Sequence, residues 1–156
     1  MKGKIMSTGT SKKFSKILAA IDGSEPSMDA AYYAILMARL YNADLIVLHS
    51  SPEKIRYEYE DKIDSGGIVE LPRQDIEEKS FSKIKEKCKE NNVNLITEVV
   101  TSSKSVAADI VDYAESNVVD LIVVGTRGRS GFKKLLLGSV ASGVVTYAQC
   151  PVMVVK

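Results

Sequence analysis

The chain has 156 residues, 45% hydrophobic and 26% charged, and 21 basic and 20 acidic side chains leave a net charge of +1. This size predicts one domain that buries a core without metal or disulfide bridges, and the charge balance argues against a dedicated nucleic-acid-binding protein. No apolar run approaches the ~18 residues of a membrane span, and Cys88 and Cys150 lie far apart, so we expect a cytoplasmic protein.

The first elements in chain order are a tail, a strand, a helix and a second strand. Residues 1–14 are rich in Lys, Ser, Thr and Gly and predict a flexible tail before a domain that spans 15–156. The short apolar run at 16–21 predicts a strand buried on both faces. A helix should follow from Ser24, a good N-cap residue, through about Tyr41. Its apolar faces would be formed by Ala30, Ala31, Ala34, Ile35, Met37, Ala38 and Leu40.

The remaining chain continues the alternation of strands and helices. Strands are predicted at 44–50, 94–100, 119–124 and 151–155, and helices at 72–91, 103–117 and 138–148. Residues 51–70 are expected to form a long surface connection, and 125–137 a glycine-rich loop. This order predicts a single doubly wound α/β domain with a parallel sheet and helices on both faces. Its ligand would sit beyond the carboxyl ends of the strands, where the winding reverses.

The glycine-rich loop is the clearest candidate for ligand binding. It leaves a strand at Gly125 and ends where a helix starts at Gly138. Glycines let backbone N–H groups approach a phosphate, and a helix start directs free N–H groups at the same anion. The loop also carries Arg127, Arg129, Lys133 and Lys134. It matches neither the P-loop nor the dinucleotide fingerprint.

The spacing Gly125-x2-Gly128-x9-Gly138-Ser139 resembles the ATP-binding signature of the universal stress protein family. Three further segments resemble the same family in the same order: 16–24, 45–49 and the closing 150–155. With the stretch 120–128, the resemblance covers essentially the whole domain.

The resemblance implies five parallel strands in the order 3-2-1-4-5 and a regulatory stress-response protein that binds ATP or AMP. Mg²⁺ would be recruited by the phosphates, and a homodimer would form by antiparallel pairing of residues 152–155. Asp22 would contact the nucleoside, the backbone of Ser50 the adenine edge, and Val124 the base or sugar. Ser50 departs from the apolar residue that is frequent in the family. The full implied site is Ala20, Asp22, Ser50, Val124, Gly125, Arg127, Gly128, Gly138, Ser139 and Val140.

Each of these residues also has a purely structural interpretation. Asp22 could cap the following helix, but Ser24 is the better-placed cap, so we favour a ligand role for Asp22. His49 ends a buried strand and is expected to be structural, and Cys88 is expected to fill the core. No general base stands beside the loop, so no catalytic residue is predicted. A slow ATP hydrolase or phosphotransferase, and a ligand-free interaction scaffold, remain the alternative functions.

Overall fold

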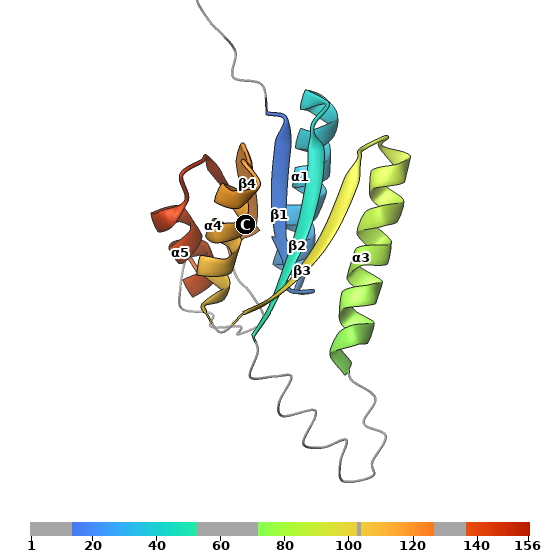
Figure 1. Cartoon of the computed structure of the whole chain (residues 1–156). Coiled ribbons are helices and arrows are strands. Elements are labelled where there is room, and N and C mark those ends of the chain that lie inside the picture. The colour runs from blue at the N-terminus through green and yellow to red at the C-terminus, as the bar shows by residue number, and fades with distance from the viewer. Residues whose placement is uncertain (1–13, 53–71, 103, 127–136) are drawn as a thin grey trace, which may run out of the picture.

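The computed structural model describes residues 14–52, 72–102, 104–126 and 137–156 (Figure 1). Five parallel strands form one sheet in the order β3-β2-β1-β4-β5, as predicted. The strands are β1 (Lys16–Ile21), β2 (Asp44–Pro52), β3 (Leu95–Ser102), β4 (Leu121–Gly125) and β5 (Val152–Val155). β2 continues two residues into the predicted surface connection, and the rest of that connection, 53–70, lies outside the described residues.

In the part of the chain that the structure describes, four helices cover the two faces of the sheet (Figure 1). They are α1 (Glu25–Tyr41), α3 (Pro72–Glu90), α4 (Val106–Ser116) and α5 (Ser139–Tyr147). α1 and α3 pack with one buried cluster of the sheet, and α4 and α5 pack with the other. The predicted fold with helices on both faces is therefore confirmed. Within the described ranges, no helix is both long enough and apolar enough to cross a membrane.

β1 lies at the centre of the sheet because its residues are apolar on both sides. Ile17 and Ala19 point into the α1/α3 cluster and Leu18 into the α4/α5 cluster, and none of the three is exposed. A strand flanked by β2 and β4 and covered on both faces needs such a continuous apolar run. The predicted strand at 16–21 has the same bounds in the structure.

α1 begins and ends where its sequence signals it. The Ser24 side chain accepts a hydrogen bond from the Ser27 N–H, and Asn42 ends the helix with a left-handed φ of 51°. Leu40 was predicted on an apolar face, but its side chain is 74% exposed, so that assignment is wrong. Phe14 belongs to the predicted tail, yet its ring packs edge-to-face on Tyr41 with centroids 4.9 Å apart.

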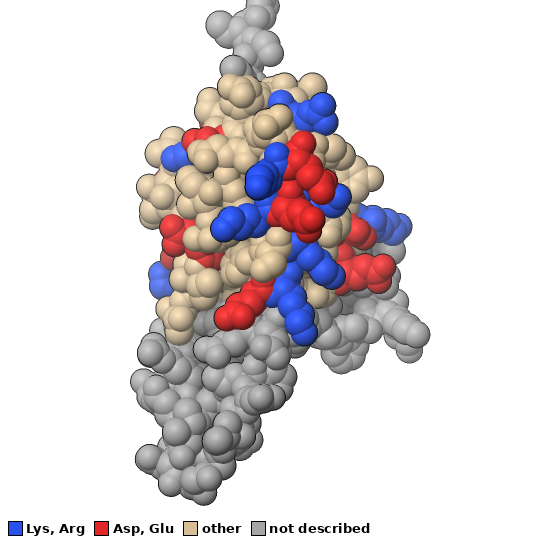
Figure 2. Space-filling view, turned by 90° about the vertical axis from the view of Figure 1, so that its right-hand side faces the viewer, with Lys and Arg blue, Asp and Glu red and all other residues tan. Residues whose placement is uncertain are grey.

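The exposed side of α3 carries charges of both signs. In Figure 2, which faces this side of the molecule, Lys and Arg are interleaved with Asp and Glu. One such pair is Lys87 and Glu90, whose charged atoms are 2.8 Å apart. On the opposite side of the helix Cys88 is buried, and burial raises the pKa of its thiol to about 11. This supports the prediction that Cys88 fills the core, because a protonated thiol is a poor nucleophile.

α4 and α5 approach each other closely at Gly143. A Cβ added to Gly143 would lie 2.7 Å from the Cβ of Ala107 on α4. Alanine normally stabilises a helix by about 1 kcal/mol over glycine, but overpacking costs about 1–3 kcal/mol. We therefore expect Gly143→Ala to lower the free energy of unfolding by about 1 kcal/mol in urea denaturation.

The control for this prediction is the double variant Gly143→Ala with Ala107→Gly, which moves the methyl group from one helix to the other. It should be more stable than the sum of its two single changes predicts, because the clash is removed. An alanine at 143 that leaves stability unchanged or raises it would show that the two helices separate without cost.

Candidate functional site

The carboxyl ends of β1, β2 and β4 lie side by side at one edge of the sheet. Ile21, the last residue of β1, pairs with His49 of β2, so Asp22 follows the end of β1 next to the point where β2 continues into Ser50. Ala19 pairs with Val123 of β4, so the end of that strand lies on the other side of β1. The chain moves from β1 to β2 on one side and later returns to β4 on the other. The winding therefore reverses between β1 and β4, the place where such folds bind ligands.

Several of the described candidate residues lie in the layer between the sheet and α4 and α5. Ala20, Val124 and Val140 all belong to the cluster between the sheet and these helices. Side chains alternate along a strand, so Ser50 shares that face with Leu48 of the same cluster, and its hydroxyl contacts α4. The structure thus brings together residues that the sequence places up to 120 positions apart, from Ala20 to Val140.

Asp22 braces the turn between β1 and α1. Its Oδ1 accepts hydrogen bonds from the backbone N–H of Ser24 at 3.0 Å and from its hydroxyl at 2.5 Å. The Asp22 N–H in turn donates to the Oγ of Ser27 at 3.2 Å, and Gly23 between them has a φ of 79°. Ser24, and not Asp22, is the residue that caps α1, as predicted. Asp22 therefore stands in a fixed turn at the sheet edge.

Ser50 is tied to α4 by a buried carboxylate. Its hydroxyl donates to Oδ2 of Asp109 at 2.6 Å, and Asp109 is only 6% exposed. Asp109 lies in the first turn of α4, which Ser105 caps by accepting from the N–H of Ala108 at 3.2 Å. The end of β2 is therefore held against the start of α4.

Gly125 has a structural cause that the sequence analysis did not identify. A Cβ at this position would lie 2.7 Å from the carbonyl oxygen of Pro26 and 3.1 Å from the backbone nitrogen of Ser27. Real Cβ atoms do not approach backbone atoms this closely, so only glycine lets α1 start beside the end of β4. Glycine at position 125 is therefore required for the packing of α1 against β4, whether or not a phosphate is bound.

The two ends of the glycine-rich loop meet in the structure. The N–H of Gly138 donates to the carbonyl of Thr126 at 2.7 Å, and the N–H of Thr126 donates to the carbonyl of Val155 at 2.7 Å. Gly125 and the start of α5 are therefore neighbours. Arg127 and Gly128 were predicted at the phosphates, but they lie outside the described residues, as do Arg129, Lys133 and Lys134.

The start of α5 lacks a side-chain cap. Gly138 is the N-cap residue and, within the described chain, no side chain accepts from the first N–H groups of the helix. Ser139 is exposed at this end and Val140 is half-buried. Free N–H groups and the positive end of the helix dipole favour an anion here. Among the described residues no group of three His, Cys, Asp or Glu side chains could hold a metal ion.

His49 is buried beside the candidate site but turned into the fold. Its Nδ1 lies 2.9 Å from the carbonyl oxygen of Ile21, and the side chain is 9% exposed. The contact joins β1 and β2 at their carboxyl ends. This geometry supports the structural role that the sequence predicted for it.

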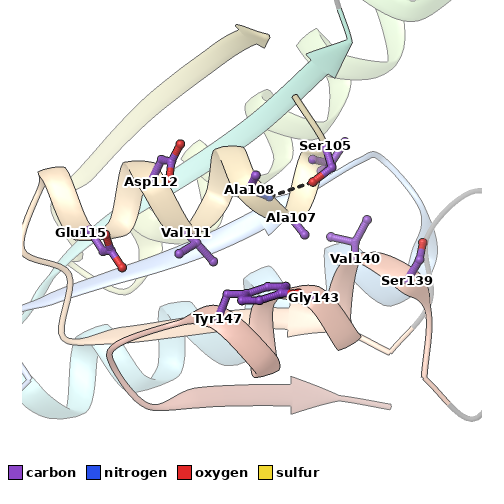
Figure 3. Close-up of a pocket in the computed structure, with 11 residues that line it drawn as sticks. Ser105, Ala107, Ala108, Val111, Asp112, Glu115, Ser139, Val140, Gly143 and Tyr147 are labelled. Carbon is purple, nitrogen blue, oxygen red and sulfur yellow. Dashed lines mark hydrogen bonds between the residues drawn. The ribbon is translucent and has the colours of Figure 1, made fainter. Parts of the chain in front are cut away.

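A separate groove of about 650 Å³ runs between α4 and α5 (Figure 3). Val111 of α4 and Tyr147 of α5 project toward each other across it. Ser139 and Val140 line one end of this groove, whereas Asp22 and Ser50 do not line it. The groove therefore touches the candidate site only at the start of α5.

Sequence reasoning missed Asp109. An acidic residue in the first turn of a helix is an ordinary dipole-stabilising feature, so its type alone carries no functional signal. The position of Asp109 does carry such a signal, since it lies three residues after Val106 and one before Ile110, and both of these apolar side chains pack in the cluster beneath α4. A carboxylate on an apolar face needs a partner, and Ser50 is that partner.

Comparison with known proteins places the whole described domain beside one family. The model of the universal stress protein family matches residues 13–156. A universal stress protein of Methanocaldococcus jannaschii is 34% identical over 151 residues, which cover 92% of this chain and 82% of that protein. One from Bacillus subtilis is 35% identical over 153 residues and covers 92% and 99%.

Solved structures of the family share the fold. Universal stress protein UspA from Lactobacillus plantarum superposes with a TM-score of 0.76 at 22% identity, covering 92% of this chain and 99% of that one. A structure from Archaeoglobus fulgidus, solved in complex with dAMP, has a TM-score of 0.67 at 23% identity and covers 92% and 99%. Another universal stress protein, solved in complex with cAMP, has a TM-score of 0.67 at 22% identity and covers 92% and 98%.

Proposed function

Because the chain belongs to the universal stress protein family, we propose that it is a regulatory stress-response protein that binds an adenine nucleotide at the carboxyl edge of β1, β2 and β4. The observation that carries the proposal is the juxtaposition at this edge. Asp22 and Ser50 lie at the carboxyl ends of the adjacent strands β1 and β2, Ser50 contacts α4, and the uncapped start of α5 adjoins the end of β4. Family structures with dAMP and cAMP support the ligand class.

Each part of a nucleotide has a matching group at this edge. The apolar side chains of Ala20, Val124 and Val140 offer contact area to the base and sugar. Asp22 offers an anionic acceptor for ribose hydroxyls, since carboxylates accept hydrogen bonds. The first N–H groups of α5, with the Ser139 hydroxyl, would receive the phosphates.

The residues fit a nucleotide better than they fit a dedicated metal site. Glycine at the N-cap of α5 leaves the helix N–H groups to an external acceptor, which a capping side chain would otherwise occupy. A Mg²⁺ ion would be held chiefly by the phosphates themselves. The function would be binding and regulation, because phosphoryl transfer also needs a positioned water or hydroxyl nucleophile.

We also propose that the chain forms a homodimer through β5. This strand lies at the edge of the sheet, and its apolar residues Val152, Met153 and Val154 are only half-buried. An open apolar edge strand invites pairing with a second strand. Antiparallel pairing of two copies of Val152–Val155 would cover it.

The nucleotide proposal is tested by thermal unfolding with ATP and AMP, after analysis of the purified protein for bound nucleotide. At 100 times its dissociation constant, a ligand should stabilise the native state by about 2.7 kcal/mol. Asp22→Asn should weaken ATP binding about tenfold, because a carboxamide is a weaker acceptor than a carboxylate. Its remaining oxygen can still accept from Ser24, so the turn is preserved.

The matched control is Asp44→Asn, a carboxylate at the opposite end of the neighbouring strand, which should leave ATP affinity unchanged. The proposal fails if millimolar ATP and AMP leave the midpoint of thermal unfolding of the native chain unchanged and no nucleotide is released on denaturation. The chain would then be a ligand-free scaffold.

A further inference from the structure

The strongest unexplained feature at the proposed site is the buried pair of Ser50 and Asp109. Asp109 is only 6% exposed, and within the described chain its side chain hydrogen-bonds only to Ser50. Helix capping does not account for the pair, since Ser105 already caps α4. The carboxylate instead reaches out of its own helix to the end of β2.

The hydrogen bond determines what the Ser50 hydroxyl can offer to a ligand. A serine hydroxyl has one proton and two lone pairs and normally rotates to act as donor or acceptor. In the 2.6 Å contact the Ser50 hydroxyl is the donor and Oδ2 of Asp109 is the acceptor. Once that proton is committed to Asp109, only the lone pairs of Oγ remain for another partner. Ser50 therefore faces any neighbour as an acceptor.

A hydrogen-bond acceptor at this position distinguishes 6-aminopurines from 6-oxopurines. Adenine carries a 6-amino group, which donates hydrogen bonds, whereas hypoxanthine and guanine carry a 6-oxo group, which accepts them. An acceptor facing a 6-oxo group leaves both oxygens without a proton between them, and such unpaired polar contacts are costly when buried. Sites that hydrogen-bond one substrate group discriminate strongly against analogues that lack it.

We propose that Asp109 is a specificity-determining residue: by fixing the Ser50 hydroxyl as an acceptor, it selects 6-aminopurine over 6-oxopurine nucleotides. The inference rests on the proposed nucleotide site and on the base edge lying at the end of β2, as the family resemblance implies. It adds a side-chain determinant to a contact that the family resemblance assigned to backbone alone. Asp109 acts through Ser50 and is a positioning residue.

The test compares ATP with inosine triphosphate, which replaces the 6-amino group of the base by a 6-oxo group. Dissociation constants for both are measured by calorimetry on the full chain and on Asp109→Asn. Asparagine can donate to Ser50 and release its proton toward a 6-oxo group. The ratio of the inosine to the adenosine dissociation constant should therefore fall about tenfold, the change that 1.4 kcal/mol produces.

Two further variants separate specificity from folding. Ser50→Ala removes the hydroxyl and should also lower the ratio, which keeps the inference testable if Asp109→Asn does not fold. Asp112→Asn is the matched control, because this exposed carboxylate one turn along α4 pairs with Lys104 at 2.7 Å and should not move the ratio.

The outcomes distinguish the two proposals. If the native chain binds neither nucleotide, the proposed function fails and this inference fails with it. If the native chain binds ATP but the ratio stays constant in Asp109→Asn and Ser50→Ala, only the role of Asp109 is overturned. If the ratio shifts equally in Asp112→Asn, the loss of any negative charge on α4 would explain the effect, and the role of Asp109 would also be overturned.

Discussion

Replacing Gly125 with alanine is expected to lower the free energy of unfolding by about 3 kcal/mol, the upper end of ordinary overpacking costs. The new Cβ would stand 2.7 Å from the carbonyl oxygen and 2.8 Å from the carbonyl carbon of Pro26. Backbone atoms cannot rotate away as a side chain can, so α1 would have to shift at its first turn. For a chain of this size the midpoint of thermal unfolding should fall by roughly 6–12 °C.

The comparison with Gly143 tells whether the nature of the contacted atom decides the cost. At Gly143 the added methyl meets a side chain, and removing that methyl with Ala107→Gly should relieve the clash. At Gly125 it meets the backbone at Pro26, so no substitution in α1 offers the same relief. A Gly125→Ala variant as stable as the parent would mean that α1 does not start as close to β4 as the structure shows.

Gly125 also illustrates where prediction from sequence ends. It was predicted at the start of the loop, but in the structure Gly125 is the last residue of β4 and pairs with Val155. The family pattern assigned it to phosphate binding. The contact with Pro26 depends on the tertiary placement of α1 beside β4, which no local pattern reports. The same residue type is compatible with both causes, so the stability and binding effects of a substitution there must be measured separately.

The strands and helices themselves were predictable for local reasons. A short apolar run with turn residues behind it, as at Lys16–Ile21, favours a strand buried on both faces, and Ser24 marks the start of the next helix. Leu40 was misplaced because a long apolar side chain near a helix end satisfies the helical period without being buried. The Ser50–Asp109 bond joins residues 59 positions apart, so only the fold reveals it.

The direction of the free hydrogen-bonding groups on β5 follows from its pairing with β4. The carbonyl of Pro151 accepts from Ile122 at 3.0 Å, and that of Val155 accepts from Thr126 at 2.7 Å. Successive residues of a strand turn their backbone groups to opposite sides in the sheet plane. The N–H and C=O of Val154 therefore point to the open edge, where the proposed homodimer would form, and those of Met153 point to β4.

Val154→Pro is therefore expected to dissociate the proposed homodimer while the monomer stays folded. Proline lacks the N–H, and edge strands accept it where that group points away from the sheet. In an antiparallel pair related by a two-fold axis, each copy loses the hydrogen bond that its Val154 N–H would donate. At about 1.4 kcal/mol for each of two hydrogen bonds, the dissociation constant should rise roughly 100-fold, measured by sedimentation equilibrium.

Met153→Pro provides the matched control, because it removes an N–H that faces β4 and should destabilise the monomer itself by about 3 kcal/mol. Circular dichroism and thermal unfolding then separate a dissociated fold from a damaged one. If Val154→Pro remains as dimeric as the parent at every concentration, the copies associate through another surface. If the parent is already monomeric, the half-buried edge of β5 is tolerated in solution and the proposed interface is wrong.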